Sequence, residues 1–288
     1  MTQINTSASK VVWILVALYL LFTFIKSLTG LIPDGLIVFL NIGILLSIAV
    51  IHGVFQYGLR NFLIFFVIVF VISSAYENLS VATGFPFGSY HHAESLGPKL
   101  FLVPIIIAPT YFVVGYISWC IALTLLDVFN KQLNGDQIWS VPLVASFVMT
   151  MWDLQIDSIS STIYKGWFWH DGGSFFGVPI MNYLGWLLCT YSFFQIFAIY
   201  LFKASQFSRN KIRTTLNDGH WYQVVFVYVT LSLPVVFLPF IGDTATVKDP
   251  AGVEWNTMVM YKSMALITIF TMWFVAILSF LNIRKKLL

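Results

Sequence analysis

The stretch NFLIFFVIVFVISSAYENLSVATGFPFGSYHH, residues 61–92, decides the class of this protein. It begins with a mostly apolar run, residues 62–76, inside a span near 60–79 of the roughly 20 residues that a membrane-crossing helix needs. The run ends at a glutamate, Glu77, and a Gly-Phe-Pro-Phe-Gly turn and two adjacent histidines follow. The stretch therefore predicts a transmembrane helix with an acidic residue, Glu77, at its end, next to a polar loop.

The composition of the whole chain also indicates a membrane protein. Hydrophobic residues make up 59% of the 288 residues and charged residues only 9%, whereas a soluble domain has about 25% charged residues. So little polar surface cannot keep the chain in water. The net charge of +3 is no sign of nucleic-acid binding, and we expect none.

Eight apolar runs are long enough to cross a bilayer. They show no alternation with a period of two, which favours helices over a transmembrane barrel. We predict one all-α polytopic membrane domain over residues 1–288, a bundle of about eight helices with spans near 11–29, 35–56, 60–79, 99–126, 138–157, 182–203, 221–241 and 257–281. We interpret the first run as a helix and not as a signal peptide, because no small-residue cleavage site follows it.

The basic residues predict the orientation, because Lys and Arg concentrate on the cytoplasmic side of a membrane protein. With eight spans, ten of the fifteen Lys and Arg residues fall on the face that holds both termini. Both termini are therefore predicted to be cytoplasmic. The polar segments 76–92 and 152–182 then open on the opposite face, where they can share one site.

Three acids lie where these two segments meet the membrane: Glu77, Asp153 and Asp157. The two aspartates are four residues apart, so on a helix they share one face. An acid at this depth is energetically costly and indicates a function. The alternative is that the acids pair with histidines to hold helix ends together. We favour a catalytic role for Asp153.

The histidines His91, His92 and His170 lie in the same two segments. We favour a structural role for them, because adjacent residues do not easily turn towards one ion, and the chain has no HxxxH pair of the kind found in membrane di-iron enzymes. No metal or other cofactor is predicted. Cys120 and Cys189 fall inside predicted helices, where a buried thiol is expected to serve packing.

Carboxylic acids in an aromatic pocket suit the protonation of an alkene. Burial and a like-charged neighbour favour the protonated form of a carboxyl group in general, so the pair Asp153 and Asp157 can keep one proton available. Aromatic faces stabilise the carbocation that results, and aromatic residues crowd segment 152–186, among them Trp152, Trp167, Trp169, Phe175, Phe176, Tyr183 and Trp186. The alternative is that these rings form the aromatic belt of the membrane interface.

Taken together, three groups of residues resemble the membrane carotenoid hydratase family, which includes the γ-carotene and bisanhydrobacterioruberin hydratases. In chain order they are Glu77 with VATGFPFGSY at 81–90, then Trp152, Asp153 and Asp157, then Gly177, Pro179, Asn182, Gly185 and Trp186. The resemblance implies the addition of water to the terminal double bond of a linear carotenoid, without a redox cofactor. A tertiary alcohol would be the product.

The resemblance makes Glu77, Asp153 and Asp157 the catalytic candidates, and we infer that Asp153 donates the proton. The substrate-binding candidates are polar and aromatic residues of the same segments: Tyr90, His91, Trp152, Trp169, His170, Phe176, Asn182 and Trp186. The chain departs from the family pattern at Ser80, His92 and Ser158, where the family has Gly, an aromatic residue and Pro. These departures leave the substrate and the fate of the cation open.

Other functions stay open at this point. If water is excluded, the same cation is attacked by another double bond or loses a proton, and the protein is then a terpenoid cyclase or isomerase. Two alternatives are not enzymes: a transporter and a non-catalytic isoprenoid carrier. The expected partners are a hydrophobic isoprenoid, the lipid bilayer and neighbouring enzymes of isoprenoid synthesis. The ending RKKLL, residues 284–288, resembles a dilysine signal, so we expect the endoplasmic reticulum in a eukaryote and the plasma membrane in a prokaryote.

Overall fold

A computed structural model describes residues 6–29, 34–207, 216 and 218–285 of the protein. The described chain is mostly helical. Its helices are α1 (Thr6–Thr29), α2 (Asp34–Thr83), α3 (Ile107–Leu125), α4 (Gln137–Ser158), α5 (Ile180–Phe207), α6 (Asp218–Ile241), α7 (Thr257–Thr268) and α8 (Phe274–Lys285). Four of the ten Lys and Arg residues that the orientation assigns to the face with the termini lie outside the described residues: Arg209, Lys211, Arg213 and, in the dilysine-like ending, Lys286.

Five helical stretches are long and apolar enough to cross a membrane: Leu40–Thr83, Ile107–Leu125, Ile180–Ser205, Gly219–Ile241 and Thr257–Lys285. In the last of these, α7 and α8 are joined by a π-helical turn at Ile269–Trp273. These stretches fit the predicted all-α membrane protein. A helix satisfies its own backbone hydrogen bonds, which is the condition for a stable segment in lipid.

The helix α2 contains a break at Gly58, whose φ of 76° and ψ of 157° are not helical. Glycine is the residue that adopts a positive φ at no steric cost. The two arms of α2 then pack closely, because a Cβ on Gly53 would lie 2.1 Å from the ring of Phe62. Two glycines therefore produce the turn between the predicted runs 35–56 and 60–79.

We expect the substitution Gly53→Ala to destabilise the protein by about 1–3 kcal/mol, the usual cost of overpacking a core. The added methyl group would push the Phe62 ring away from its contact. Gly43→Ala is the matched control, since nothing lies within 4 Å of a Cβ at that position. Thermal unfolding in detergent measures both. Equal melting temperatures for the two variants would contradict the close packing of the two arms.

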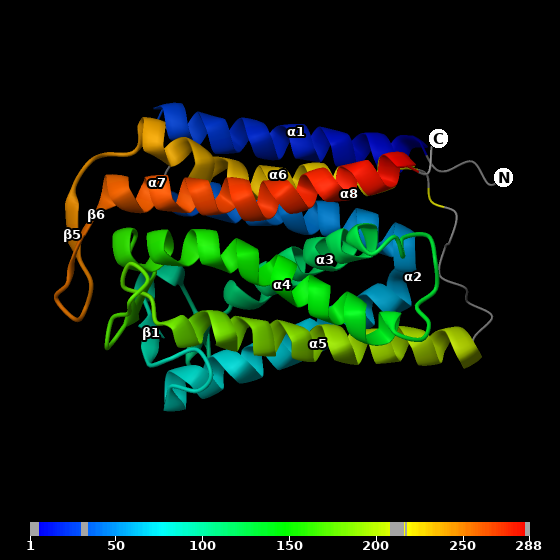
Figure 1. Ribbon diagram of the computed structural model, residues 1–288, viewed down its shortest axis with the longest axis horizontal. Coiled ribbons are helices and arrows are strands. Elements are labelled where there is room, and N and C mark those ends of the chain that lie inside the picture. The colour runs from blue at the N-terminus through cyan, green and yellow to red at the C-terminus, as the bar shows by residue number, and fades with distance from the viewer. Residues whose placement is uncertain (1–5, 30–33, 208–215, 217, 286–288) are drawn as a thin grey trace.

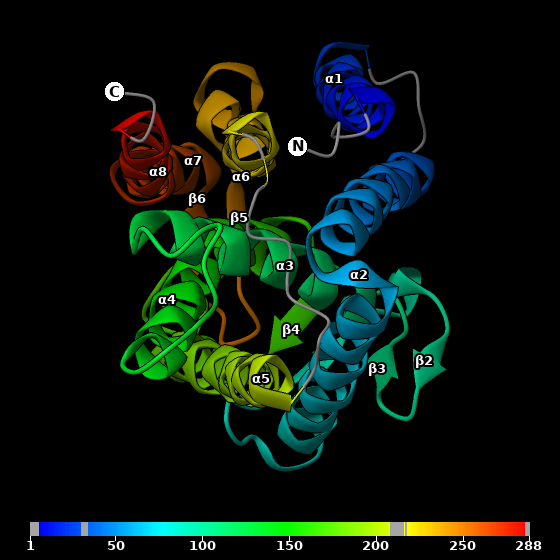
Figure 2. The ribbon, with the colours of Figure 1, turned by 90° about the vertical axis from the view of Figure 1, so that its right-hand side faces the viewer.

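The helix α3 lies at the centre of the bundle, and α2, α4, α5 and α6 surround it (Figure 2). Fifteen of its nineteen residues are buried. The prediction that this span begins at residue 99 is wrong. Strand β2 (Lys99–Leu100) instead pairs with β3 (Val103–Pro104), and the helix starts only at Ile107. Two prolines, Pro98 and Pro104, lack the N–H groups that a continuous helix would need.

The short strands lie at one end of the bundle, whereas the start of α1 and the end of α8 lie at the opposite end (Figure 1). Strand β1 (Tyr90–His92) pairs antiparallel with β4 (Trp167–Trp169), and β5 (Thr246–Lys248) pairs with β6 (Glu254–Asn256). Strands β1 and β4 belong to the two polar segments that the sequence singles out. The predicted convergence of these segments is therefore seen in the structure.

Candidate functional site

Three buried acids lie at the end of the bundle that carries β1 and β4. Glu77 comes from the last two turns of α2, and Asp153 and Asp157 come from the last turns of α4. Their exposed fractions are 6%, 3% and 1%. Both aspartates lie close enough to Glu77 to interact with it electrostatically. The three predicted catalytic candidates thus form one group, which we call the acid cluster.

One amide holds the two aspartates together. The Nδ2 atom of Asn182 donates to Oδ2 of Asp153 at 2.9 Å and to Oδ2 of Asp157 at 2.5 Å. The indole N–H of Trp167 donates to the other oxygen of Asp157 at 2.7 Å. Asp157 therefore accepts two N–H groups and Asp153 only one. Because hydrogen bonds from N–H donors stabilise a carboxylate, Asp157 is the better site for the charge and Asp153 for a proton.

The helix α4 changes its winding directly after the aspartates. Residues Ile159–Ile163 form a π-helical turn, a feature that is frequent at functional sites. The turn leads into β4 and brings Trp167 back over Asp157, ten residues after it in the chain. The local fold therefore explains how the helix end and the following loop can contact the same carboxyl group.

Glu77 is held by two tyrosines. The hydroxyl of Tyr111 donates to Oε1 at 2.7 Å, and the hydroxyl of Tyr90 donates to Oε2. Burial and the neighbouring Glu77 raise the pKa of Tyr90 well above its ordinary value, so this phenol stays a donor. The ring of Tyr111 stacks on Trp186, with centroids 4.5 Å apart and planes 11° apart. Glu77 is thus held by a group of aromatic residues, Tyr90, Tyr111 and Trp186, which we call the aromatic wall.

The two strands β1 and β4 form a ribbon that closes the acid cluster. Tyr90 lies opposite Trp169, and His92 lies opposite Trp167. Side chains alternate between the two faces of a strand, so these four side chains share the inner face. Because Tyr90 contacts Glu77 and Trp167 contacts Asp157, the ribbon connects both halves of the cluster.

The side chain of His92 lies at this junction. It is 4% exposed, and its Nε2 atom is 3.9 Å from Oε2 of Glu77. Its Nδ1 atom is buried and has no hydrogen-bond partner. Two further buried atoms beside the acids also have no hydrogen-bond partner: the hydroxyl of Tyr183 and Nε1 of Trp169. The indole of Trp169 lies near Asp157 but does not form a well-oriented hydrogen bond with it.

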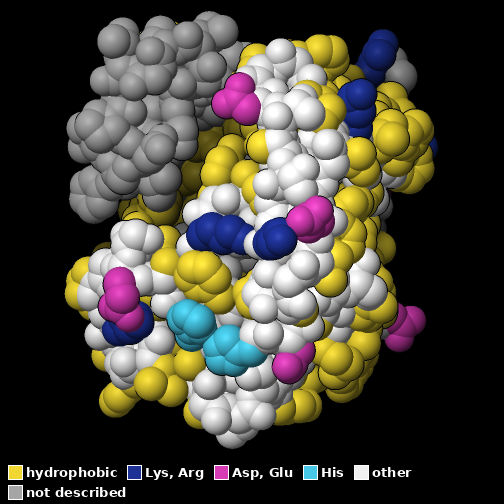
Figure 3. All heavy atoms as spheres, turned by 90° about the vertical axis from the view of Figure 1, so that its left-hand side faces the viewer, with side chains coloured by type: hydrophobic (Ala, Val, Ile, Leu, Met, Phe, Trp, Pro, Cys, Tyr) yellow, Lys and Arg dark blue, Asp and Glu magenta, His cyan; other side chains and the backbone are white. Residues whose placement is uncertain are grey.

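The histidines His91 and His170 lie on the outer surface instead. Nδ1 of His91 is 2.7 Å from Nε2 of His170, and Ser89 contacts the other nitrogen of His170 at 3.0 Å. Figure 3 shows the two imidazoles side by side on this end of the molecule. The structure does not bring these two substrate-binding candidates to the acid cluster, because the alternation along β1 turns His91 outward.

The remaining substrate-binding candidates are aromatic residues that pack with other rings. The ring centroids of Trp152 and Trp186 are 6.0 Å apart, and those of Phe176 and Trp255 of the β5–β6 hairpin are 5.4 Å apart. Trp152 and Trp186 belong to the main hydrophobic core, whereas Phe176 packs in a smaller cluster around Ile159. Hydrogen bonds from aromatic side chains to the acids come instead from Tyr90, Tyr111 and Trp167.

Tyr111 is the site residue that the sequence did not reveal. It is a single tyrosine near the start of an apolar helix, and no motif distinguishes it from a packing residue. A phenol in the first turns of a span, at the same membrane depth as Glu77, is the signal that could have found it. The sequence identified Tyr183 and Trp167 only as two of the many aromatic residues in segment 152–186.

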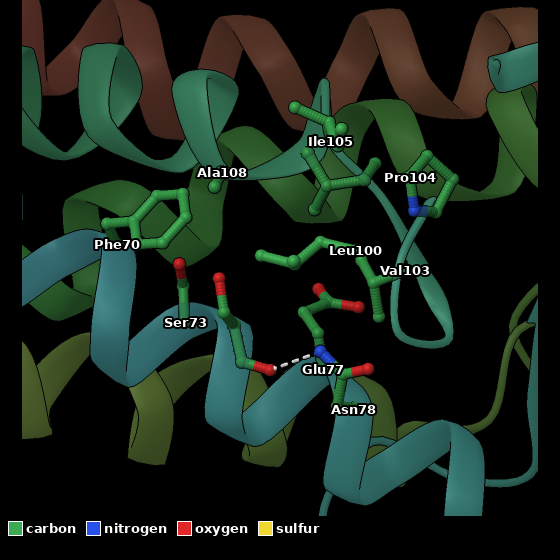
Figure 4. A pocket seen from close by; sticks show the side chains of 11 residues that line it. Phe70, Ser73, Glu77, Asn78, Leu100, Val103, Pro104, Ile105 and Ala108 are labelled. Atoms are coloured by element: carbon green, nitrogen blue, oxygen red, sulfur yellow. Dashed lines mark hydrogen bonds between the residues drawn. The ribbon is translucent and has the colours of Figure 1, made fainter. Parts of the chain in front are cut away.

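A small, partly open pocket lies beside Glu77. Helix α2 supplies Phe70, Glu77 and Asn78 on one side, and Leu100, Val103 and others on the opposite side come from the β2–β3 region (Figure 4). Most of the lining is aliphatic or aromatic. The pocket therefore offers an apolar surface next to Glu77.

In the part of the chain that the structure describes, no three His, Cys, Asp or Glu side chains are grouped to hold a metal ion. Cys120 and Cys189 are buried and do not form a disulfide. Both thiols lie inside helices, in the positions where the sequence predicts packing residues.

Comparisons with known proteins give one family and one relative. A family model described as carotenoid biosynthesis protein matches residues 35–247, a range that includes the whole acid cluster. The bisanhydrobacterioruberin hydratase of Haloarcula japonica is 28% identical over 172 residues, which is 58% of this chain and 56% of the relative. The chain thus matches just over half the length of that relative. No solved structure matches the chain.

Proposed function

The chain belongs to the carotenoid biosynthesis protein family, and we propose that it adds water to the terminal double bond of a linear carotenoid or a related polyprenyl lipid. The resemblance to this family that the motifs indicate is confirmed. Membership supports an enzyme that modifies carotenoids. The observation that carries hydration is the acid cluster: three buried carboxyl groups within one aromatic enclosure, beside an apolar pocket.

The proposed reaction begins with proton transfer from the aspartate pair to the alkene. Asp153 accepts one hydrogen bond and Asp157 two, so Asp153 is the proposed donor and Asp157 carries the charge that remains. The tertiary cation is stabilised by the ionised acids and by the faces of Trp152, Trp186 and Tyr111. Water then adds to the cation, which gives the alcohol. Without water, loss of a proton or ring closure would give an isomer.

The polyene chain is proposed to lie against the pocket beside Glu77. The lining is mostly apolar, which suits contact with a hydrocarbon, and it includes Glu77 of the acid cluster. The partners of the protein would then be the isoprenoid substrate, the surrounding bilayer and neighbouring enzymes of the same synthesis. The membrane would be the plasma membrane in a prokaryote and the endoplasmic reticulum in a eukaryote.

The proposed topology has eight spans in one polytopic domain, with both termini cytoplasmic. The break at Gly58 divides α2 into two spans, and α7 with α8 forms the last one. The start of α1 and the end of α8 lie at one end of the bundle and the β1–β4 ribbon at the other (Figure 1). This arrangement supports an even number of spans, and with cytoplasmic termini the acid cluster would lie near the non-cytoplasmic face.

Cysteine labelling tests this topology, because both native cysteines are buried. We expect a membrane-impermeant maleimide to label Glu94→Cys on intact cells, since this side chain is 88% exposed at the ribbon end. Asp136→Cys, in the exposed loop before α4 at the opposite end, should be labelled only after permeabilisation. The reverse pattern would show that the proposed orientation is inverted.

Expression in a host that makes linear carotenoids tests the proposed reaction. Mass spectrometry of the pigments should show a product heavier than its precursor by one water. A product of unchanged mass would favour a cyclase or isomerase instead. If the protein is inserted and folded and no isoprenoid changes, the proposed enzyme activity is wrong, and the carrier or transporter alternatives gain support.

A further inference from the structure

We propose that His92 holds the water that adds to the cation and accepts its proton. The proposal rests on the hydration proposed above and adds a second residue type to the acid chemistry, a neutral base. It also gives a reason why a histidine stands at this position in this chain. His92 is suited to this role by its position, by the state of its two nitrogens and by the polar atoms around it.

His92 and Glu77 face each other without a direct hydrogen bond. The distance of 3.9 Å from Nε2 to Oε2 of Glu77 is too long for one. A water molecule that contacts both groups can connect them across this separation. The strand β1 fixes the imidazole between Glu77 and Trp167, which places it between the two halves of the acid cluster.

A purely structural histidine would have its nitrogens paired, because buried polar groups are nearly always hydrogen-bonded. Nδ1 of His92 has no partner, and neither have the hydroxyl of Tyr183 and Nε1 of Trp169 beside the acids. A buried water needs two to four polar partners. Oε2 of Glu77 and Nε2 of His92 supply two of them, and the unpaired atoms leave hydrogen-bonding capacity around the acids for a reactant water.

The environment of His92 keeps the imidazole neutral. Burial, with smaller contributions from Lys99 and His91, lowers the pKa of His92 to about 4. The groups that face it are Glu77 at 3.9 Å and the rings of Tyr90 and Trp167. A neutral imidazole has a free lone pair, so at neutral pH it can accept a proton from water.

The proposed step conserves atoms and charge. An O–H bond of the donor acid breaks, and its proton forms a C–H bond with the alkene, which leaves a carboxylate and a tertiary cation. The oxygen of the water forms a C–O bond, and one of its protons moves to His92. The imidazolium then returns that proton through the acid cluster to the carboxylate. The sum is alkene plus water to alcohol, with the enzyme restored.

The test replaces His92 by Phe, which keeps a ring but removes both nitrogens. In the carotenoid-producing host, we expect the ratio of alcohol to isomers of unchanged mass to fall by about tenfold or more, because water is no longer held and activated. His92→Gln, which retains a donor and an acceptor, should recover part of the ratio. An unchanged ratio in folded His92→Phe protein would overturn the proposal.

A pH profile gives an independent measurement that does not depend on the Phe variant being stable. In wild-type membranes, the alcohol fraction should be constant from neutral pH down to about pH 5 and decrease as the pH approaches about 4, where His92 becomes protonated. His92→Gln should lack this decrease, and the same decrease in this variant would overturn the proposal. If wild-type protein makes no alcohol at any pH, the hydration itself fails and not the role of His92.

Discussion

We expect Asp153→Asn to lower turnover by at least about 100-fold, the lower end of what a positioned general acid contributes. The amide cannot donate the proton that starts the reaction, although it has nearly the same shape as the acid. Asn182 can still donate to the new side-chain oxygen, so the neighbouring Asp157 keeps its contacts. The alcohol formed per unit of membrane protein, measured by mass spectrometry, reports the loss.

The matched control is Asp171→Asn, the same chemical change at an exposed position on the same end of the molecule. We expect it to leave the yield of alcohol unchanged. A thermal unfolding curve should show that Asp153→Asn is at least as stable as the wild type, because it removes an ionisable group from a buried site. A stable Asp153→Asn protein with wild-type turnover would exclude Asp153 as the donor and direct attention to Glu77.

This variant also separates an enzyme from a carrier. A protein that only binds an isoprenoid would keep its affinity for the lipid after Asp153→Asn, since the substitution changes neither the apolar pocket nor the aromatic wall. An enzyme would keep binding and lose the product. Extraction of the bound lipid from purified protein, measured beside product formation, distinguishes the two. The pocket lining contains Glu77 but neither aspartate, so binding and proton donation can be changed separately.

The position of the acid cluster was predictable because charged residues are so rare in this chain. Glu77, Asp153 and Asp157 stood out against apolar runs, and the distribution of Lys and Arg placed their loops on one face. The family motifs then selected Asn182 and Trp186. These inferences depend on residue type and spacing alone, and the structure brings the three acids together as expected.

The contacts that hold the cluster were not predictable from the same information. Tyr111 looks like any aromatic residue of an apolar helix, and only the packing of α3 against α2 shows that it donates to Glu77. The outward turn of His91 depends on the register of β1 with β4. The late start of α3 depends on a two-strand hairpin too short to give a periodic pattern.

The sequence also did not predict a second group of buried polar side chains, at the other end of the bundle. His52 stacks on His220, with ring centroids 3.5 Å apart, and its Nδ1 atom is 2.5 Å from the hydroxyl of Tyr116. The two histidines are separated by more than half of the chain, and each lies near the end of an apolar run that faces the termini. Because nothing in the sequence connects them, their contact follows only from how α2, α3 and α6 pack.

The second large effect is expected from Asn182→Ala, because one amide serves two buried acids. Without it, Asp153 loses its only hydrogen bond in the structure and Asp157 keeps only that from Trp167. Hydrogen bonds to charged groups contribute about 1.5–3 kcal/mol each, so we expect unfolding to become easier by about 2–3 kcal/mol. Turnover should fall as well, since the shared proton is no longer held between the two acids.

The control for this prediction is Asn61→Ala, where the lost amide contacts only neutral groups, the carbonyl of Tyr57 and the hydroxyl of Tyr200. We expect a smaller cost there, about 1 kcal/mol. Repeating Asn182→Ala in a protein that already carries Asp153→Asn and Asp157→Asn completes a thermodynamic cycle, in which contacting residues show coupling of about 0.5–3 kcal/mol. If Asn182→Ala costs the same in both backgrounds, Asn182 serves packing and not the acids, and the shared proton would need another explanation.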